Sequence, residues 1–156
     1  MHISSAQDRY NGFVEYLKQK GLSKDCVEIL ECNGTRSDST KVMSKWLTQF
    51  SESRKPPITS IFCFSDYVAY GVYSALAKYN LRIPEDISVI GYDNIEYSDM
   101  TLPPLTTVDM KPYNVGMHAA QVMLDLINHK TDLTSPVKEI MSPKLVLRNS
   151  TAQLSL

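Results

Sequence analysis

The sequence predicts an α/β fold: a three-layer, doubly wound parallel sheet with helices on both faces. Helix-like and strand-like segments alternate along most of the 156 residues, and this order makes successive strands parallel through right-handed crossovers. Two apolar runs, 60–64 and 87–92, each lead into an aspartate, Asp66 and Asp93, with one helix-length segment between them. Ligands bind at the carboxyl ends of parallel strands, so the two aspartates indicate a small-molecule site.

The first part of the chain predicts a helix, a strand and a second helix. Apolar residues recur at helical spacing from Tyr10 to Leu17, and Gly21 is well placed to end that helix. The short apolar run 26–30 is typical of a strand. A polar loop then leads into a helix over about 40–50.

The middle of the chain predicts a strand, a helix and another strand. The prolines at 56 and 57 prevent helix continuation and introduce a strand over 58–64. A helix over 67–79 follows, and then the strand 87–92.

The last elements surround a fourth helix. A short strand over 105–108 leads to Pro112, a favourable first residue of a helix. Two short strands, over 137–141 and 144–148, end the fold. The predicted inner face of the fourth helix consists of Val115, Ala119, Val122, Met123 and Leu126.

Composition excludes several classes of function. The formal net charge is −1 and the basic residues are scattered, so no global positive field attracts nucleic acid to this chain alone. The three cysteines form no C-x-x-C pair, which favours a reducing compartment. No signal-like or membrane-length apolar run occurs, and we therefore expect a cytoplasmic protein without membrane contact.

Five segments, taken together and in this order, resemble the effector-binding region of LacI/GalR-type transcriptional regulators, which share the fold of periplasmic sugar-binding proteins. Any one segment is a weak signal, whereas the ordered set covers nearly the whole chain. The segments are S-S-A-Q-D-R-Y-N-G-F at 4–13, F-S-D-Y-V-A-Y-G at 64–71, I-P-E-D-I-S-V-I-G-Y-D at 83–93, L-P-P-L-T-T-V at 102–108 and K-L-V-L-R-N-S-T at 144–151.

The resemblance implies a sensor fragment of a DNA-binding repressor. Regulators of this family join a helix-turn-helix to two α/β lobes that enclose a cleft for a sugar or purine. It implies that 1–104 forms the C-terminal lobe, that 105–130 belongs to the N-terminal lobe, and that 131–156 returns to the C-terminal lobe as a tail. Because the chain opens with a helix and not with a central strand, we expect the start of a larger protein, including the helix-turn-helix, to be missing. Operator DNA would then be bound only through that missing domain.

The resemblance also implies which residues bind the effector. Arg9 matches the arginine that reaches into the cleft, where a guanidinium suits vicinal hydroxyls or a carboxylate. Asp93 matches the G-Y-D aspartate that accepts hydrogen bonds from ligand hydroxyls. Ser65 and Asp66 occupy the place where many relatives carry Asn-Asp, and Ser65 departs from that pattern.

Each of these assignments has a structural alternative. Arg9 could be a solvated arginine that pairs with a nearby acid of its own helix, and Asp93 could be a turn residue. Asp66 could simply cap the helix that begins at Tyr67. The loop 32–36 lacks the aromatic residue that relatives often place there. Its Arg36 would either make a charged contact with an anionic effector or remain solvated.

Four further residues point to self-association. In the family, the helix at 67–79 and the segment before the prolines at 103–104 contribute to a homodimer interface. Tyrosine suits such a surface because its ring buries area while the hydroxyl stays hydrated. The alternative is that these side chains form core or an exposed stripe. The four residues are Tyr67, Tyr70, Tyr73 and Met100.

Two other classes compete with a repressor sensor. A small enzyme could use Asp66 and Asp93 as acid and base or as Mg²⁺ ligands. The chain lacks G-x-S-x-G, P-loop and G-x-G-x-x-G motifs and a histidine pair with metal-ligand spacing, so we expect no catalysis, no cofactor and no metal. A periplasmic-type sugar receptor would share the fold, but no signal peptide is evident. The favoured mechanism is an effector-driven population shift between two lobe arrangements.

Overall fold

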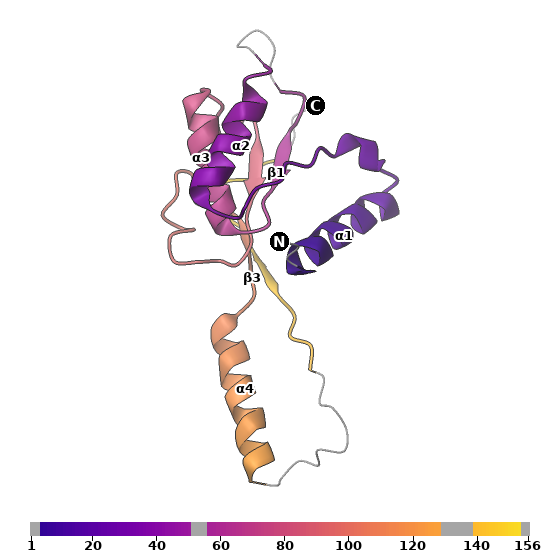
Figure 1. Cartoon of the computed structure of the whole chain (residues 1–156), viewed down its shortest axis with the longest axis vertical. Helices are drawn as coiled ribbons and strands as arrows, with labels where there is room; N and C mark the ends of the chain where they lie inside the picture. Colours follow the sequence, from indigo (N-terminus) through magenta and orange to yellow (C-terminus); the bar gives the residue numbers. More distant parts are fainter. Residues whose placement is uncertain (1–3, 51–55, 129–138, 154–156) are drawn as a thin grey trace.

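The computed structural model describes residues 4–50, 56–128 and 139–153. Its centre is a parallel pair of strands, β1 (Ser60–Phe62) and β2 (Ser88–Ile90), in which Phe62 lies opposite Ile90. Two helices, α2 (Arg36–Leu47) and α3 (Asp66–Lys78), pack side by side on one face of this pair (Figure 1).

Helix α1 (Ser4–Gln19) lies on the other side of the sheet, with most of its length away from the strands (Figure 1). The helix contacts the sheet through a stacked pair of rings, Phe13 and Phe62, whose centroids are 5.5 Å apart. Helices therefore lie on both faces, which confirms the predicted three-layer α/β architecture. No described side chain of α1 is buried, so this layer is attached far less tightly than α2 and α3.

The hydrophobic core lies between α2, α3 and the sheet. Close packing of the two helices depends on Gly71, where a Cβ atom would come within 1.9 Å of Ser39 Oγ and 2.4 Å of the Arg36 carbonyl oxygen. The buried apolar residues are Met43, Trp46, Leu47, Cys63, Val68, Ala69, Val72, Ala75, Leu76, Ile87, Val89 and Leu105.

The sheet ends differently from the prediction of purely parallel strands. A parallel bridge between Ile90 and Thr106 extends it beyond β2. Then β3 (Thr107–Asp109) and β4 (Lys144–Val146) form an antiparallel pair that leads away from the core. Antiparallel pairing is possible here because the chain leaves along β3 and returns along β4.

Several predicted boundaries were wrong for local reasons. The predicted strand over 26–30 is absent: a 3₁₀ turn, η1 (Lys24–Cys26), is followed by extended chain in which Ile29 is 56% exposed. Helix α2 begins at Arg36 and not near residue 40, because Thr35 caps it by accepting a hydrogen bond from the Asp38 amide.

The fourth helix, α4 (Pro112–Ile127), begins at the predicted proline but lies apart from α2 and α3 (Figure 1). Its predicted inner face is not buried: Val115 is 44% exposed and Met123 is 55% exposed. Of the predicted strand 137–141, residues 137–138 lie outside the described residues and 139–141 form no strand. Among the described residues, no helix is long and apolar enough to cross a membrane.

Candidate functional site

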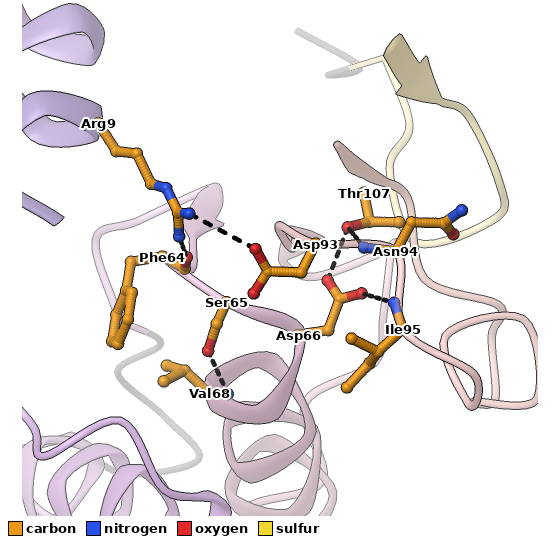
Figure 2. Close-up of polar contacts among 9 residues, drawn as sticks. All are labelled: Arg9, Phe64, Ser65, Asp66, Val68, Asp93, Asn94, Ile95 and Thr107. Carbon is orange, nitrogen blue, oxygen red and sulfur yellow. Dashed lines mark hydrogen bonds and ion pairs between the residues drawn. The ribbon is translucent and has the colours of Figure 1, made fainter. Parts of the chain in front are cut away.

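Arg9 and Asp93 meet at the carboxyl end of the parallel strands, although 84 positions separate them in the sequence (Figure 2). Arg9 extends from α1, and one of its Nη2 hydrogens points at Asp93 Oδ1, with 3.5 Å between the nitrogen and the oxygen. Its Nη1 donates a hydrogen bond to the carbonyl oxygen of Phe64, just beyond β1. The two side chains remain 19% and 36% exposed, so a ligand can reach both.

The ring of Tyr92 also contacts Arg9. Arg9 Cζ lies 3.6 Å from the centroid of this ring, a cation–π contact. The backbone of Tyr92 is itself fixed, because its carbonyl accepts a 2.8 Å hydrogen bond from the Asp66 amide. Arg9 is therefore not a solvated arginine that pairs within its own helix.

Asp93 sits in a strained turn. Its φ is 105° and that of Asn94 is 51°, in the left-handed region that non-glycine residues rarely adopt. The turn is held by the Asp93 amide, which donates to the Val108 carbonyl at 2.9 Å, and by the Asn94 amide, which donates to Thr107 Oγ1 at 3.4 Å. This backbone geometry directs the Asp93 carboxylate toward Arg9 (Figure 2).

The surroundings of Asp93 make its carboxyl harder to ionise than that of a free aspartate. Burial raises the pKa of the Asp93 carboxyl above its ordinary value, and the nearby Asp66 carboxylate raises it further, whereas Arg9 opposes the shift. The ionised carboxylate is thus incompletely compensated within the protein.

Asp66 lies beneath this pair and is fully buried. Its carboxylate accepts hydrogen bonds from Thr107 Oγ1 at 2.6 Å and from the Ile95 amide at 3.0 Å (Figure 2). It also accepts a hydrogen bond from Ser98 Oγ. These bonds tie the start of α3 to β3 and to the loop after the Asp93 turn. The arrangement supports the site from below.

Ser65, not Asp66, caps α3. Ser65 has extended backbone angles, and its Oγ accepts a hydrogen bond from the Val68 amide at 3.4 Å. Asp66 is the first helical residue, so its carboxylate stands in the favourable field of the helix N-terminus. The alternative in which Asp66 itself caps the helix was wrong, because the hydroxyl one residue earlier makes that bond.

The closing segment of the chain braces the same turn. The Arg148 guanidinium donates to the Leu105 carbonyl at 2.7 Å and to Asn94 Oδ1 at 2.8 Å. Ser150 Oγ donates to the Val89 carbonyl at 2.6 Å. Arg148 thus holds Asn94 of the Asp93 turn, and Ser150 ties the same closing segment to β2.

The loop without an aromatic residue turns at Gly34, whose φ is 85°. A Cβ atom at Gly34 would lie 3.1 Å from the Phe64 ring, so that ring occupies the space beside the loop. The Arg36 guanidinium donates to Ser74 Oγ on α3 at 3.3 Å. Arg36 borders a shallow surface cavity of about 540 Å³.

The four residues predicted for a dimer interface divide into two pairs. Tyr67 is 58% exposed and Met100 is 69% exposed. The Tyr70 hydroxyl lies 3.0 Å from Ser98 Oγ, and the Tyr73 hydroxyl donates to the Pro103 carbonyl at 3.0 Å. Tyr70 and Tyr73 thus anchor the 98–103 segment against α3, while the other two face outward.

Sequence reasoning missed Tyr92, Thr107 and Arg148 as parts of this site. Tyr92 directly precedes Asp93 in G-Y-D, and this position was the available signal for a contact with Arg9. No sequence pattern indicates that Thr107 contacts Asp66 or that Arg148 contacts Asn94, because the partners are far apart in the sequence. The described residues contain no group of three or more side chains that could hold a metal ion.

Comparison with known proteins shows the family of the chain. A family model described as a periplasmic binding protein-like domain matches residues 2–151. The chain belongs to this family. The sequence relatives in this family are LacI-type repressors. The chain is 35% identical over 147 residues to the HTH-type transcriptional repressor PurR of Pasteurella multocida, and the match covers 94% of this chain and 42% of that protein.

Solved LacI-family structures share the fold. A regulator from Enterococcus faecium with bound ribose has a TM-score of 0.83 at 26% identity, over 96% of this chain and 53% of that one. A regulator from Arthrobacter sp. FB24 in complex with lactose has a TM-score of 0.77 at 27% identity, over 88% of this chain and 49% of that one. This member of the periplasmic-binding-protein-like family therefore spans about half of these relatives or less.

Proposed function

We propose that this chain is the effector-sensing part of a LacI-type transcriptional repressor in the cytoplasm. One observation carries the proposal: Arg9 and Asp93, from separate crossover units, lie 3.5 Å apart at the partly exposed strand edge. The Asp93 carboxylate can accept a hydrogen bond from one hydroxyl of a ligand, while the Arg9 guanidinium donates to the neighbouring hydroxyl. In this proposal, Ser65 and Asp66 lie beneath the Arg9–Asp93 pair and shape the site.

The ligand class that fits best is a sugar or a related polyhydroxylated metabolite. The Arg9–Asp93 pair is neutral overall, which suits an uncharged ligand with vicinal hydroxyls more than an anion. The loop at Gly34 supplies no ring on which a purine could stack. Ribose and lactose are bound by two structural relatives, and both offer adjacent hydroxyls.

The effector would act by shifting a population of lobe arrangements. Residues 1–104 and the tail form one lobe in this assignment, and 105–130, with β3 and α4, belong to the other. The exposed side chains of Tyr67 and Met100 are assigned to a homodimer contact. Tyr70 and Tyr73 support the 98–103 segment, to which Met100 belongs. Operator DNA would be bound by a helix-turn-helix that this chain does not contain.

Titration calorimetry of the full-length protein with ribose, lactose and free purine bases tests the proposal. A compound that binds wild type should lose roughly 10- to 150-fold in affinity in Asp93→Ala, the range for a hydrogen bond to a charged group. Asp99→Ala, an exposed carboxylate in the same loop, is the matched control and should leave affinity unchanged. Undiminished affinity in Asp93→Ala would refute the assignment. The 156-residue chain alone should bind weakly, because it carries little of the opposing lobe.

A further inference from the structure

Arg9 has three anchors, and an effector would compete for only one of them. The 3.5 Å separation from Asp93 is longer than the roughly 2.7–2.9 Å of a fully formed charge-assisted hydrogen bond. The Phe64 carbonyl and the Tyr92 ring are the other two. An effector that binds Arg9 and Asp93 would loosen the contact between them. It would leave the contacts of Arg9 with the Phe64 carbonyl and the Tyr92 ring in place.

We infer that Tyr92 is a positioning residue: its ring holds the Arg9 guanidinium in place while an effector exchanges with the Arg9–Asp93 contact. The inference rests on the proposed function of this site and adds a residue to it. A ring that contacts one face of the guanidinium leaves the N–H donors in the guanidinium plane free for ligand oxygens. Tyr92 is thus a neighbour of Arg9 and need not touch the effector.

Arg9 needs such a support because α1 is weakly fixed. No described side chain of α1 is buried, and besides Arg9 the helix contacts the sheet through the Phe13–Phe62 stack. A long arginine side chain on a loosely packed helix would otherwise sample many rotamers, and ordering them upon binding would weaken the complex. The ring of Tyr92 removes that cost before the effector arrives.

The ring itself has a fixed base. The Tyr92 carbonyl accepts from the Asp66 amide, and the next residue, Asp93, is fixed through its own amide by the Val108 carbonyl. The backbone on both sides of the Tyr92 side chain is therefore held by main-chain hydrogen bonds. These bonds do not involve the Tyr92 side chain, so substitutions there change the ring and leave the bonds intact.

Nuclear magnetic resonance of the 156-residue chain tests the contact without any ligand. The Arg9 Hδ and Hε protons, which lie against the ring, should be shifted upfield in wild type. Tyr92→Phe keeps the ring and should keep the shift, whereas Tyr92→Leu should return these protons to ordinary arginine values. Backbone amides of α3 serve as the folding control. Unchanged Arg9 resonances in a folded Tyr92→Leu variant would overturn the inference.

Calorimetry of the full-length protein then tests the role in binding. With whichever compound of the ribose, lactose and purine panel binds wild type, Tyr92→Leu should weaken affinity roughly three- to tenfold, as expected for a partly buried cation–π contact. Tyr92→Phe should stay within about twofold. In an Arg9→Met background, Tyr92→Leu should have no further effect, because the ring acts only through Arg9. A further loss in that background would overturn the positioning role. If no compound of the panel binds wild type, the proposed function fails, and the resonance comparison still decides the contact.

Discussion

Helices α3 and α4 differ in burial much more than in sequence character. Both are rich in apolar residues, and they contain 13 and 16 residues. Seven residues of α3 are buried, whereas none of α4 is. Apolar spacing therefore predicts that a helix forms and which face is apolar, but burial depends on a partner surface. Within this chain, α3 has that partner in α2 and the sheet, and α4 has none among the described residues.

The largest expected contrast comes from removing one leucine in each helix. Leu76 of α3 is fully buried, and Leu124 of α4 is 50% exposed. Leu76→Ala should lower the free energy of unfolding by about 3–5 kcal/mol, because it removes buried methyl groups and leaves a cavity. Leu124→Ala should change it by less than about 0.5 kcal/mol. Urea unfolding followed by circular dichroism measures both, and equal losses would break the comparison.

The second contrast separates the two aspartates. Asp66→Ala leaves three donors without their acceptor in a buried region, and should cost about 3 kcal/mol of stability. Asp93→Ala removes a partly exposed carboxylate and should cost less than about 1 kcal/mol. The same denaturation experiment applies. A stable Asp66→Ala variant would show that this carboxylate does not support the site.

The third contrast uses a glycine in each helix. Gly71→Ala in α3 forces a methyl group against Ser39 and the Arg36 carbonyl of α2, and should destabilise by about 1–3 kcal/mol. Gly116 in α4 has no atom within 4 Å of the position of a Cβ, so Gly116→Ala should stabilise by about 0.5–1 kcal/mol through helix propensity. Melting temperatures should move in opposite directions. A loss of stability in Gly116→Ala would mean that α4 is packed after all.

How much of the fold the sequence predicts depends on the range of the forces involved. Local signals performed well: Pro112 begins α4, and Gly21, with a φ of 73°, ends α1. The apolar run 26–30 predicted a strand wrongly, because a strand needs a neighbour to pair with and composition cannot supply one. Ser65 capped α3 in place of Asp66, since either side chain suits that position by type.

For the site, the sequence motif brought Arg9 and Asp93 together correctly as neighbours at one edge. It could not reveal that Thr107 holds Asp66 or that Arg148 holds Asn94 of the turn, because these contacts span 41 and 54 positions. The same limit applies to Asp93, whose positive φ depends on bonds to β3 and not on local propensity. Functional geometry here comes mostly from long-range hydrogen bonds.

The smallest expected effect concerns pH. Because burial raises the pKa of Asp93 in the folded state, the folded chain binds a proton more readily than the unfolded chain at this residue. The contribution of Asp93 to stability is therefore present at low pH and is lost as pH rises through the folded-state pKa. Asp93→Asn should remove this dependence and make the effector-free protein slightly more stable at pH 7. Unfolding of both proteins at pH 4 and pH 7 measures it: the stability gain of Asp93→Asn over wild type should be larger at pH 7 than at pH 4, and a larger gain at pH 4 would contradict the sign.

The central claim is that Arg9 and Asp93 form one effector site at the strand edge. A crystal structure of the full-length protein with the compound that binds most tightly tests it directly. We predict ligand oxygens within hydrogen-bond distance of both the Arg9 guanidinium and the Asp93 carboxylate, with the Tyr92 ring still against Arg9. A ligand bound elsewhere, with the Arg9–Asp93 contact undisturbed, would contradict the account.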